Sequence, residues 1–174
     1  MDESIYVRIE REFEAIPLAL AGQLKVEDAS VTLGGPKRIL GSQAEAMVLG
    51  ALIGFRYQRR FSVENPRPDP IRFSIFESGK LDSYIYLLGI TVLGDLSKLG
   101  AGYEHELIAV FEEFANGGFQ LISEWQAEGD SLYGAILKKM EQEALTLSSK
   151  TKLKGPSIEP IIKKKRTILK PVDD

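Results

Sequence analysis

The feature of this sequence that most constrains its fold is an apolar stripe between residues 107 and 125. The stripe consists of Leu107, Val110, Phe111, Phe114, Gly118, Leu121, Ile122 and Trp125. Spacings of three and four residues are typical of one helix face, and the stripe keeps its phase through Asn116-Gly117-Gly118. We therefore predict one long helix over residues 104–127, with Gly118 where a neighbour packs tightly. Because each glycine costs about 1 kcal/mol relative to alanine in a helix, close packing or a kink should offset that cost, and a helix break at Gly117 is the alternative.

A second helix is predicted to begin after Ser42 and to lie at the centre of the core. Ser42 and Glu45 fit a capping box, in which the serine hydroxyl and the glutamate carboxylate bond free amides at the helix start. From residue 46 onward the segment is apolar on nearly every side, as expected of a buried helix. Small residues recur every four positions at Ala46, Gly50 and Gly54. This ridge predicts the close approach of another helix.

Two further helices are predicted later in the chain. Residues 81–93 place one set of apolar side chains on a single face: Leu81, Tyr84, Ile85, Leu88 and Val92. Another helix is predicted to begin after Asp130, which is a good N-cap residue. Its inward residues are predicted to be Leu132, Ile136, Leu137, Met140 and Ala144.

The N-terminal segment has two interpretations. Ile5, Ile9, Phe13 and Ile16 form a helical stripe over residues 4–16, with Pro17 ending or kinking the helix. Ile5, Val7 and Ile9 also alternate, so a strand is the alternative. Short strands are further predicted at residues 31–33 and at residues 71–75, where Ile71, Phe73 and Ile75 alternate after a proline-rich loop.

These segments predict a mainly α protein, a single-domain bundle of about five helices with at most a short strand pair. A chain of 174 residues has the length of one domain. We place the helical domain at residues 1–149 and a basic tail at residues 150–174. The tail has eight basic and three acidic residues, a net +5, so the domain carries −8 of the total −3.

The tail is predicted to be extended or disordered, because three prolines in it block a long helix. One interpretation is a solvated terminus. The other is an arm that touches phosphates or an acidic partner surface.

Composition excludes several protein classes. There is no cysteine, so no disulfide framework or thiolate zinc site exists, which is compatible with the reducing cytoplasm where we expect this chain. The N-terminus lacks the basic and apolar regions of a secretory signal. The longest apolar run, residues 46–55, is about half of the roughly 20 residues that a membrane span needs, so no membrane partner is expected.

Motifs for catalysis are weak. His105 is the only histidine, which excludes a multi-histidine metal site, and we interpret it as a surface residue. Glu112 and Glu113 are adjacent on a predicted helix, so they do not converge on one cation, and a solvated helix face explains them better. We expect no metal, cofactor or small-molecule substrate. A non-enzymatic role is favoured over an enzyme built from distant glutamates.

A cluster of basic and aromatic residues begins at the end of the second predicted helix, and it is the one group of side chains suited to binding a ligand. Arginine forks match phosphate oxygens, and neighbouring rings can stack on bases. The competing interpretation is that these arginines face the negative end of a helix dipole and pair with glutamates. The acidic domain argues against strong autonomous DNA binding. The candidate nucleic-acid-binding residues are Arg56, Arg59, Arg60, Arg67, Arg72, Lys163, Lys164, Lys165 and Arg166.

Four short motifs between residues 42 and 137 carry a family resemblance. They are Gly54-Phe55 with Arg59-Arg60, Pro70-Ile71-Arg72-Phe73, Gly94-Asp95-Leu96-Ser97, and the segment from Phe111 to Gly118. In these motifs the chain resembles small accessory proteins encoded beside the Dnd DNA-phosphorothioation genes of prokaryotes. The resemblance implies a role in phosphorothioate-linked antiphage defence and supplies no catalytic residues.

We interpret the chain as a non-enzymatic accessory subunit of a DNA-modification or restriction assembly. It would bind a larger protein partner and touch DNA through the arginine cluster, the tail, or both. The alternative is an autonomous DNA-binding transcriptional regulator, in which residues 4–10 form a dimeric β-ribbon.

Overall fold

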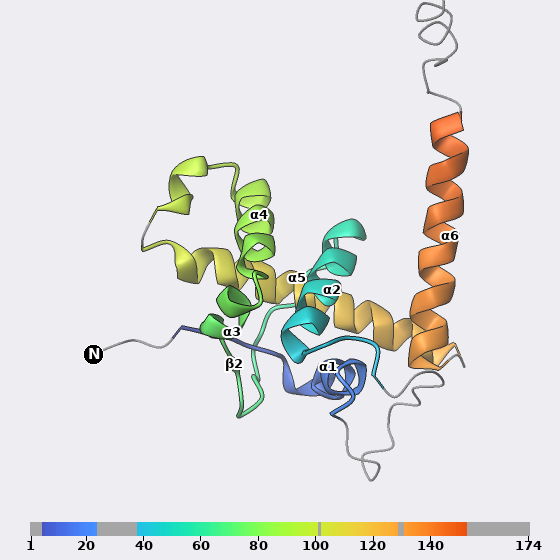
Figure 1. The fold of residues 1–174 in the computed structure, drawn as a ribbon, viewed down its shortest axis with the longest axis horizontal. Coiled ribbons are helices and arrows are strands. Elements are labelled where there is room, and N and C mark those ends of the chain that lie inside the picture. The colour runs from blue at the N-terminus through green and yellow to red at the C-terminus, as the bar shows by residue number, and fades with distance from the viewer. Residues whose placement is uncertain (1–4, 24–37, 101, 129–130, 153–174) are drawn as a thin grey trace, which may run out of the picture. The chain divides into compact units, whose positions relative to one another are not determined.

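The computed structural model describes residues 5–23, 38–100, 102–128 and 131–152, and these are mainly α-helical, as predicted (Figure 1). The elements are β1 (Tyr6–Val7), the 3-10 helix η1 (Arg11–Phe13), α1 (Ala15–Leu20), α2 (Gln43–Arg56), β2 (Ile71–Arg72), α3 (Phe73–Ser78), α4 (Asp82–Leu93), the 3-10 helix η2 (Leu96–Leu99), α5 (Glu104–Ala127) and α6 (Leu132–Lys152). The chain divides after Ile136 into two units, each described by itself. The strand predicted at residues 31–33 and most of the tail lie outside the described residues, so the boundary at 149/150 stays a prediction.

α5 is a single helix of 24 residues, so the alternative break at Gly117 is wrong. The two glycines lie where other backbone segments come closest to the helix. A Cβ atom on Gly118 would lie 1.9 Å from the carbonyl oxygen of Gly50, and one on Gly117 would lie 2.2 Å from that of Arg59. The two glycines have low helix propensity, but they are the residues that allow α5 to pack closely against the neighbouring backbone.

α2 packs against α5 through the predicted ridge of small residues. A Cβ atom on Gly54 would lie 2.0 Å from the carbonyl oxygen of Phe114, and one on Gly50 would lie 2.8 Å from that of Ala115. The two helices therefore meet backbone to backbone. This contact confirms that α2 is a central helix of the first unit.

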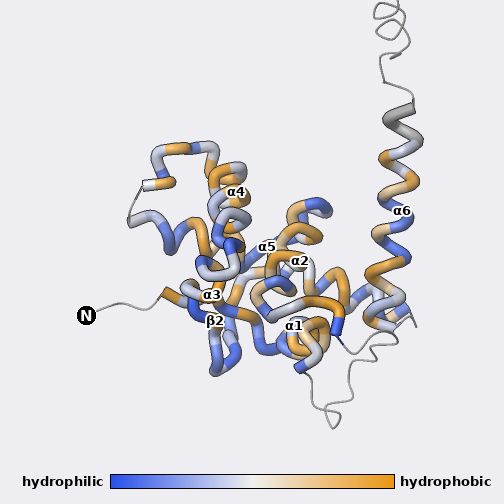
Figure 2. The backbone as a smooth tube through the Cα atoms, viewed as in Figure 1, coloured by the Kyte–Doolittle hydropathy of each residue, from blue (hydrophilic) through white to orange (hydrophobic). Residues whose placement is uncertain are grey.

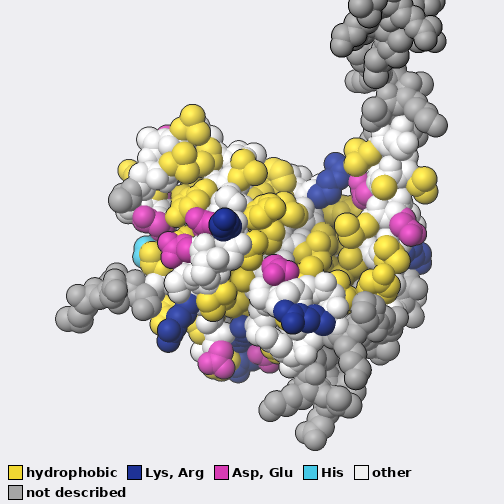
Figure 3. Space-filling model, viewed as in Figure 1, with side chains coloured by type: hydrophobic (Ala, Val, Ile, Leu, Met, Phe, Trp, Pro, Cys, Tyr) yellow, Lys and Arg dark blue, Asp and Glu magenta, His cyan; other side chains and the backbone are white. Residues whose placement is uncertain are grey.

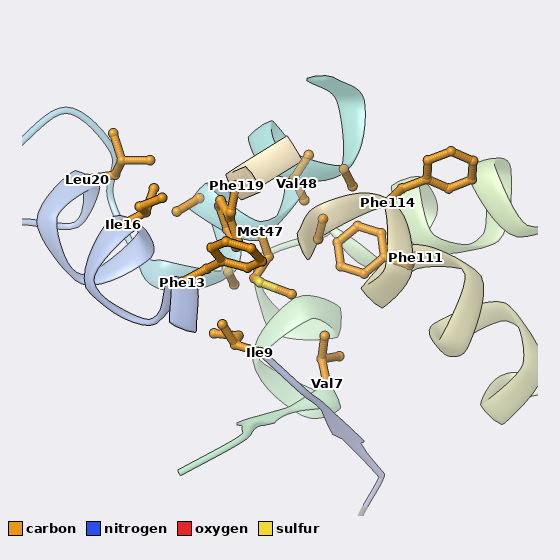
Figure 4. Packing of buried hydrophobic residues seen from close by; sticks show 14 of the residues in the cluster. Val7, Ile9, Phe13, Ile16, Leu20, Met47, Val48, Phe111, Phe114 and Phe119 are labelled. Atoms are coloured by element: carbon orange, nitrogen blue, oxygen red, sulfur yellow. The ribbon is translucent and has the colours of Figure 1, made fainter. Parts of the chain in front are cut away.

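The core of the first unit gathers around this crossing (Figure 4). Phe13 from η1, Met47 from α2 and Phe119 from α5 lie together in the close view, and each is buried. Phe76 of α3 meets Phe111 edge to face, with ring centroids 5.8 Å apart. Side chains of this size contribute about 1.5–3 kcal/mol each when fully buried.

The helix predicted over residues 4–16 is wrong in its first half, where the strand alternative is correct. β1 pairs antiparallel with β2. Val7 and Ile9 are buried, whereas Tyr6 and Arg8 are exposed. The alternation of apolar residues in the sequence therefore matches the alternation of buried and exposed side chains along the strand. η1 and α1 follow the strand. Pro17 does not end a helix but lies in the first turn of α1, where its missing amide hydrogen is not needed.

The strand predicted over residues 71–75 is correct only for its first two residues. Arg72 lies opposite Tyr6 in the sheet. From Phe73 the chain forms α3, which buries Phe73 and Phe76 and leaves Ile75 45% exposed. The apolar period changes from two to three within a few residues, and so short a window does not separate strand from helix.

α4 and α6 lie where helices were predicted, but α6 buries fewer side chains than expected. Its cap is Ser131, whose Oγ accepts a hydrogen bond from the Gly134 amide at 3.1 Å; the predicted cap, Asp130, lies outside the described residues. Leu132 and Ile136 are buried as predicted. Three residues predicted to point inward are exposed: Leu137, Met140 and Ala144. They belong to the second unit, whose described part is only the remainder of this helix.

The capping box at the start of α2 is present. The Ser42 hydroxyl accepts a hydrogen bond from the Glu45 amide at 3.2 Å. The Glu45 carboxylate accepts one from the Gly41 amide at 2.8 Å, one residue before the cap. Two amides that the helix itself cannot satisfy are thus bonded.

We expect Ser42→Ala to lower the free energy of unfolding by about 1 kcal/mol, because the Glu45 amide loses its acceptor. The melting temperature should fall by about 2–4 °C, measured by circular dichroism. Ser83→Ala is the control, since within the described residues that exposed hydroxyl bonds just the Lys80 carbonyl, and it should change stability by less than about 0.5 kcal/mol. Equal effects of the two substitutions would contradict the capping role.

Candidate functional site

An ion pair between the half-exposed Arg8 and the buried Glu112 links the N-terminal strand to α5. The Glu112 side chain is 1% exposed, and its Oε2 accepts from Arg8 Nη2 at 2.7 Å and from Arg8 Nε at 3.0 Å. Oε1 also accepts from the backbone amide of Arg8 at 2.6 Å. Burial raises the pKa of the Glu112 carboxyl, and the bonds from Arg8 oppose that rise. The prediction that Glu112 lies on a solvated face is wrong, and sequence reasoning missed Arg8.

Asn116 extends this contact along the same strand. Its Oδ1 accepts from the Glu10 amide at 2.9 Å, and its Nδ2 donates to the Glu112 carbonyl at 2.8 Å. The amides of Arg8 and Glu10 are therefore satisfied by side chains of α5 rather than by a further strand. This arrangement disfavours a dimeric β-ribbon built from residues 4–10.

The motif from Phe111 to Gly118 thus has a structural explanation. Glu112 and Asn116 hold the N-terminal strand, while Gly117 and Gly118 admit the backbones of Arg59 and Gly50. No part of this explanation requires a reaction or a ligand.

Arg59 and Arg60 follow the end of α2 rather than lying on it, and both pair with acidic residues of α5. Arg59 Nη2 lies 3.6 Å from Glu124 Oε2, and Arg60 forms an ion pair with Glu113. The Arg60 guanidinium also lies 5.2 Å from the centroid of the Phe114 ring. Both arginine side chains remain nearly half exposed, so the pairs are weak and screened by salt.

The other candidate arginines have different surroundings. Arg56 is exposed at the last turn of α2, and Arg72 is exposed on β2. Arg67 is only 9% exposed. The remaining candidates, Lys163, Lys164, Lys165 and Arg166, lie outside the described residues. The sequence cluster therefore does not fold into one uniform basic patch.

Exposed apolar side chains lie on both α4 and η2. α4 is rich in apolar residues, with more polar ones between them (Figure 2), and it buries Ile85 and Leu88. Leu87 of α4 is 63% exposed, and Leu96 and Leu99 of η2 are 73% and 53% exposed. We call these three residues the α4 face. Hydrophobic side chains gather over this region in the space-filling view (Figure 3).

Residues suited to metal or acid–base chemistry are dispersed. Among the residues that the structure describes, no three His, Asp or Glu side chains form a group that could hold a metal ion. His105 is exposed in the first turn of α5, and Glu106 beside it pairs with Lys98. None of the described helices is long and apolar enough to cross a membrane.

Comparison with known protein families gives a match over most of the chain. The family model described as DNA sulphur modification system-associated protein 4 matches residues 35–154, a range that extends from before α2 to beyond α6. No curated protein and no solved structure matches the chain. The matched range contains all four motifs that carried the resemblance in the sequence.

Proposed function

The chain belongs to the DNA sulphur modification system-associated protein 4 family, and we propose that it serves such a system as a non-enzymatic accessory subunit bound to a larger protein. Under this proposal the chain acts in the cytoplasm and takes part in phosphorothioate-linked antiphage defence. The family description supports the association with the system. The finer statement, that the chain acts by binding a protein, is supported by its surface.

The α4 face is the observation that carries this proposal. Leu87, Leu96 and Leu99 are each more than half exposed. Scattered apolar residues are normal on protein surfaces, but a helix that is apolar on both its inner and its outer side usually meets a second apolar surface. A protein partner of the same assembly supplies such a surface.

Affinity purification of the tagged full chain from native extract tests the proposal. We expect a protein of the DNA sulphur modification system to co-purify in near-stoichiometric amount and to remain bound at high salt, since apolar contacts are not screened. Recovery of the chain without any component of that system would contradict the proposal.

Contact with DNA is the subsidiary part of the proposal, and it is expected to be weak in the isolated chain. The predicted domain carries −8, and Arg59 and Arg60 are paired with glutamates. Fluorescence anisotropy with duplex DNA should show binding that falls steeply between about 50 and 200 mM salt. The double variant Arg59→Glu with Arg60→Glu should weaken it further, with a stability change of at most about 1 kcal/mol per pair.

Arg11→Glu with Lys80→Glu is the charge-matched control, because both residues are exposed and neither is a candidate contact. An equal loss of binding in this control would show that only net charge matters. Tight, salt-insensitive and sequence-specific binding by the wild type would instead favour an autonomous regulator.

A further inference from the structure

A cavity of about 290 Å³ lies between the start of α2 and the loop that leads into β2. It has no role in the partner binding proposed above. Its lining contains both polar and apolar residues: Gln23, Ser42, Gln43, Ala44, Arg67, Asp69, Pro70, Ile71 and Ile75. Three features of this lining favour an anion.

The first feature is a buried arginine with an incomplete set of partners. Arg67 is 9% exposed, and its Nε donates to the Asp69 carbonyl at 2.7 Å. Its two terminal amino groups have no hydrogen-bond or ion-pair partner within the described part of the chain. Burial lowers the pKa of Arg67, while Glu14 and Asp69 oppose that effect from a distance without forming an ion pair. Gln43 Oε1 is the one fully buried polar side-chain atom without a partner in the described structure, so the terminal amino groups of Arg67 are not enclosed by the fold and a bound anion can reach them.

The second feature is the start of α2, a helix of 14 residues. The Glu45 and Ala46 amides are bonded to Ser42. The amides of Gln43 and Ala44 have no acceptor among the residues that the structure describes. Free first-turn amides and the positive end of the helix dipole both attract anions.

The third feature is the side chain of Gln43, which also lines the cavity. Its Oε1 is buried without a hydrogen-bond partner in the described structure, while its Nε2 donates to Gln23 Oε1 at 2.5 Å. If both carboxamides turn by 180°, Gln23 Nε2 donates to Gln43 Oε1 and Gln43 Nε2 is presented to the cavity as a donor. A buried amide end without a partner is unusual in folded proteins, and a bound group would supply one.

We propose that this cavity binds a phosphate group, held by the terminal amino groups of Arg67 and by the first amides of α2. An arginine fork suits a phosphate because two donors match two of its oxygens. Asp69 lines the same cavity, and its carboxylate limits the affinity, so we expect binding near the millimolar range. The phosphate can belong to a DNA backbone or be free. Neither Leu87 nor Leu96 lines the cavity, so this inference stands or falls independently of the partner proposal.

Thermal unfolding and calorimetric titration of the full chain with inorganic phosphate test the inference, against sodium chloride at equal ionic strength. Phosphate should raise the melting temperature saturably, and chloride should not. Arg67→Met should weaken phosphate binding about tenfold or more, since it removes a charged donor. Arg11→Met, an exposed arginine outside the cavity, is the control and should bind as the wild type does.

Stability without phosphate separates a ligand-binding arginine from a structural one. In phosphate-free buffer the melting temperature of Arg67→Met should stay within about 5 °C of the wild type, because the side chain loses only the hydrogen bond from its Nε to the Asp69 carbonyl. A large loss of stability, or failure to fold, would overturn the inference. So would a phosphate effect no greater than that of chloride, or one that Arg67→Met retains.

Duplex DNA distinguishes the two sources of phosphate. If the cavity takes a backbone phosphate, inorganic phosphate competes with duplex DNA and Arg67→Met weakens both. If it takes a free phosphate, Arg67→Met weakens only inorganic phosphate binding and the two ligands do not compete. Either result supports a phosphate site and assigns its ligand.

Discussion

Gly118→Leu should be the most destabilising single substitution in the chain. The smallest side chain at this position already places a Cβ atom 1.9 Å from the Gly50 carbonyl oxygen, and that neighbour is backbone, which cannot rotate away. The substitution must therefore separate α2 from α5 along their closest contact. Overpacking of a core costs about 1–3 kcal/mol and occasionally more, and a clash with a helix backbone belongs at the upper end. Far-ultraviolet circular dichroism and melting curves measure the outcome.

A pair of alanine substitutions controls this prediction. Gly118→Ala should destabilise the protein by about 2–3 kcal/mol through the same clash. Gly134→Ala in α6 changes the same atoms, but its Cβ would meet only the Ser131 hydroxyl at 3.1 Å, so better helix propensity should leave it neutral or up to about 1 kcal/mol more stable. Equal effects at the two positions would show that α2 and α5 do not meet at Gly118.

Arg8→Met should be the second most damaging substitution. It leaves the Glu112 carboxylate, 1% exposed, without its charged partner. Breaking a buried pair costs about 3–5 kcal/mol. Because the Arg8 side chain is 48% exposed and its backbone amide still bonds Glu112, we expect about 2–3 kcal/mol at neutral pH, or roughly 5–10 °C in melting temperature.

The destabilisation by Arg8→Met should depend on pH. Burial already raises the pKa of Glu112, and the variant loses the bonds from Arg8 that oppose this rise. A carboxyl whose pKa is higher in the folded than in the unfolded state holds its proton more tightly when the protein is folded. It therefore stabilises the fold at pH values below its unfolded-state pKa, and this contribution is lost as the pH rises through its folded-state pKa. The stability difference between variant and wild type should therefore be small in mild acid and should grow toward neutral pH.

Urea unfolding at several pH values measures this difference. Arg59→Met is the control, because its pair with Glu124 is about half exposed on both sides and should contribute about 0.5 kcal/mol or less. A stability difference for Arg8→Met that does not change with pH would contradict the burial of a charged Glu112.

The two central helices were predictable because their sequence signals are long and redundant. α5 keeps one apolar phase over residues 107–125, and α2 combines a capping box with small residues every fourth position. Gly118 satisfied both patterns, since it lies on the apolar stripe and faces a ridge of small residues. Each helix thus predicted the kind of neighbour that it has.

The short elements were not predictable in the same way. Residues 5–16 contain both a strand alternation and a helical stripe, and only pairing with β2 selects the strand. α3 has six residues, less than two turns, so its apolar period is not distinct from that of a strand. Tertiary contacts decided both cases.

The polar side chains that matter most were hidden from sequence for a related reason. Glu112 is one of two adjacent glutamates, and only the fold places it against Arg8, which is 104 positions away. Arg67 looked like one member of a basic cluster, yet it is buried beside the start of α2. The only sequence feature that set Arg67 apart from the other arginines was its place in a proline-rich loop. Prolines restrict the backbone, so side chains in such a loop are held in fixed positions.

The most direct test of the central claim compares partner recovery by variants of the α4 face. Leu87→Asp with Leu96→Asp should abolish co-purification of the DNA sulphur modification component while leaving the melting temperature nearly unchanged, since both side chains are more than half exposed. Leu145→Asp in α6 is the matched control, because Leu145 is as exposed as Leu96, at 73%. We predict that this control retains the partner. Full recovery of the partner by the double variant, or its loss only in Leu145→Asp, would contradict the assignment of the α4 face as the binding surface.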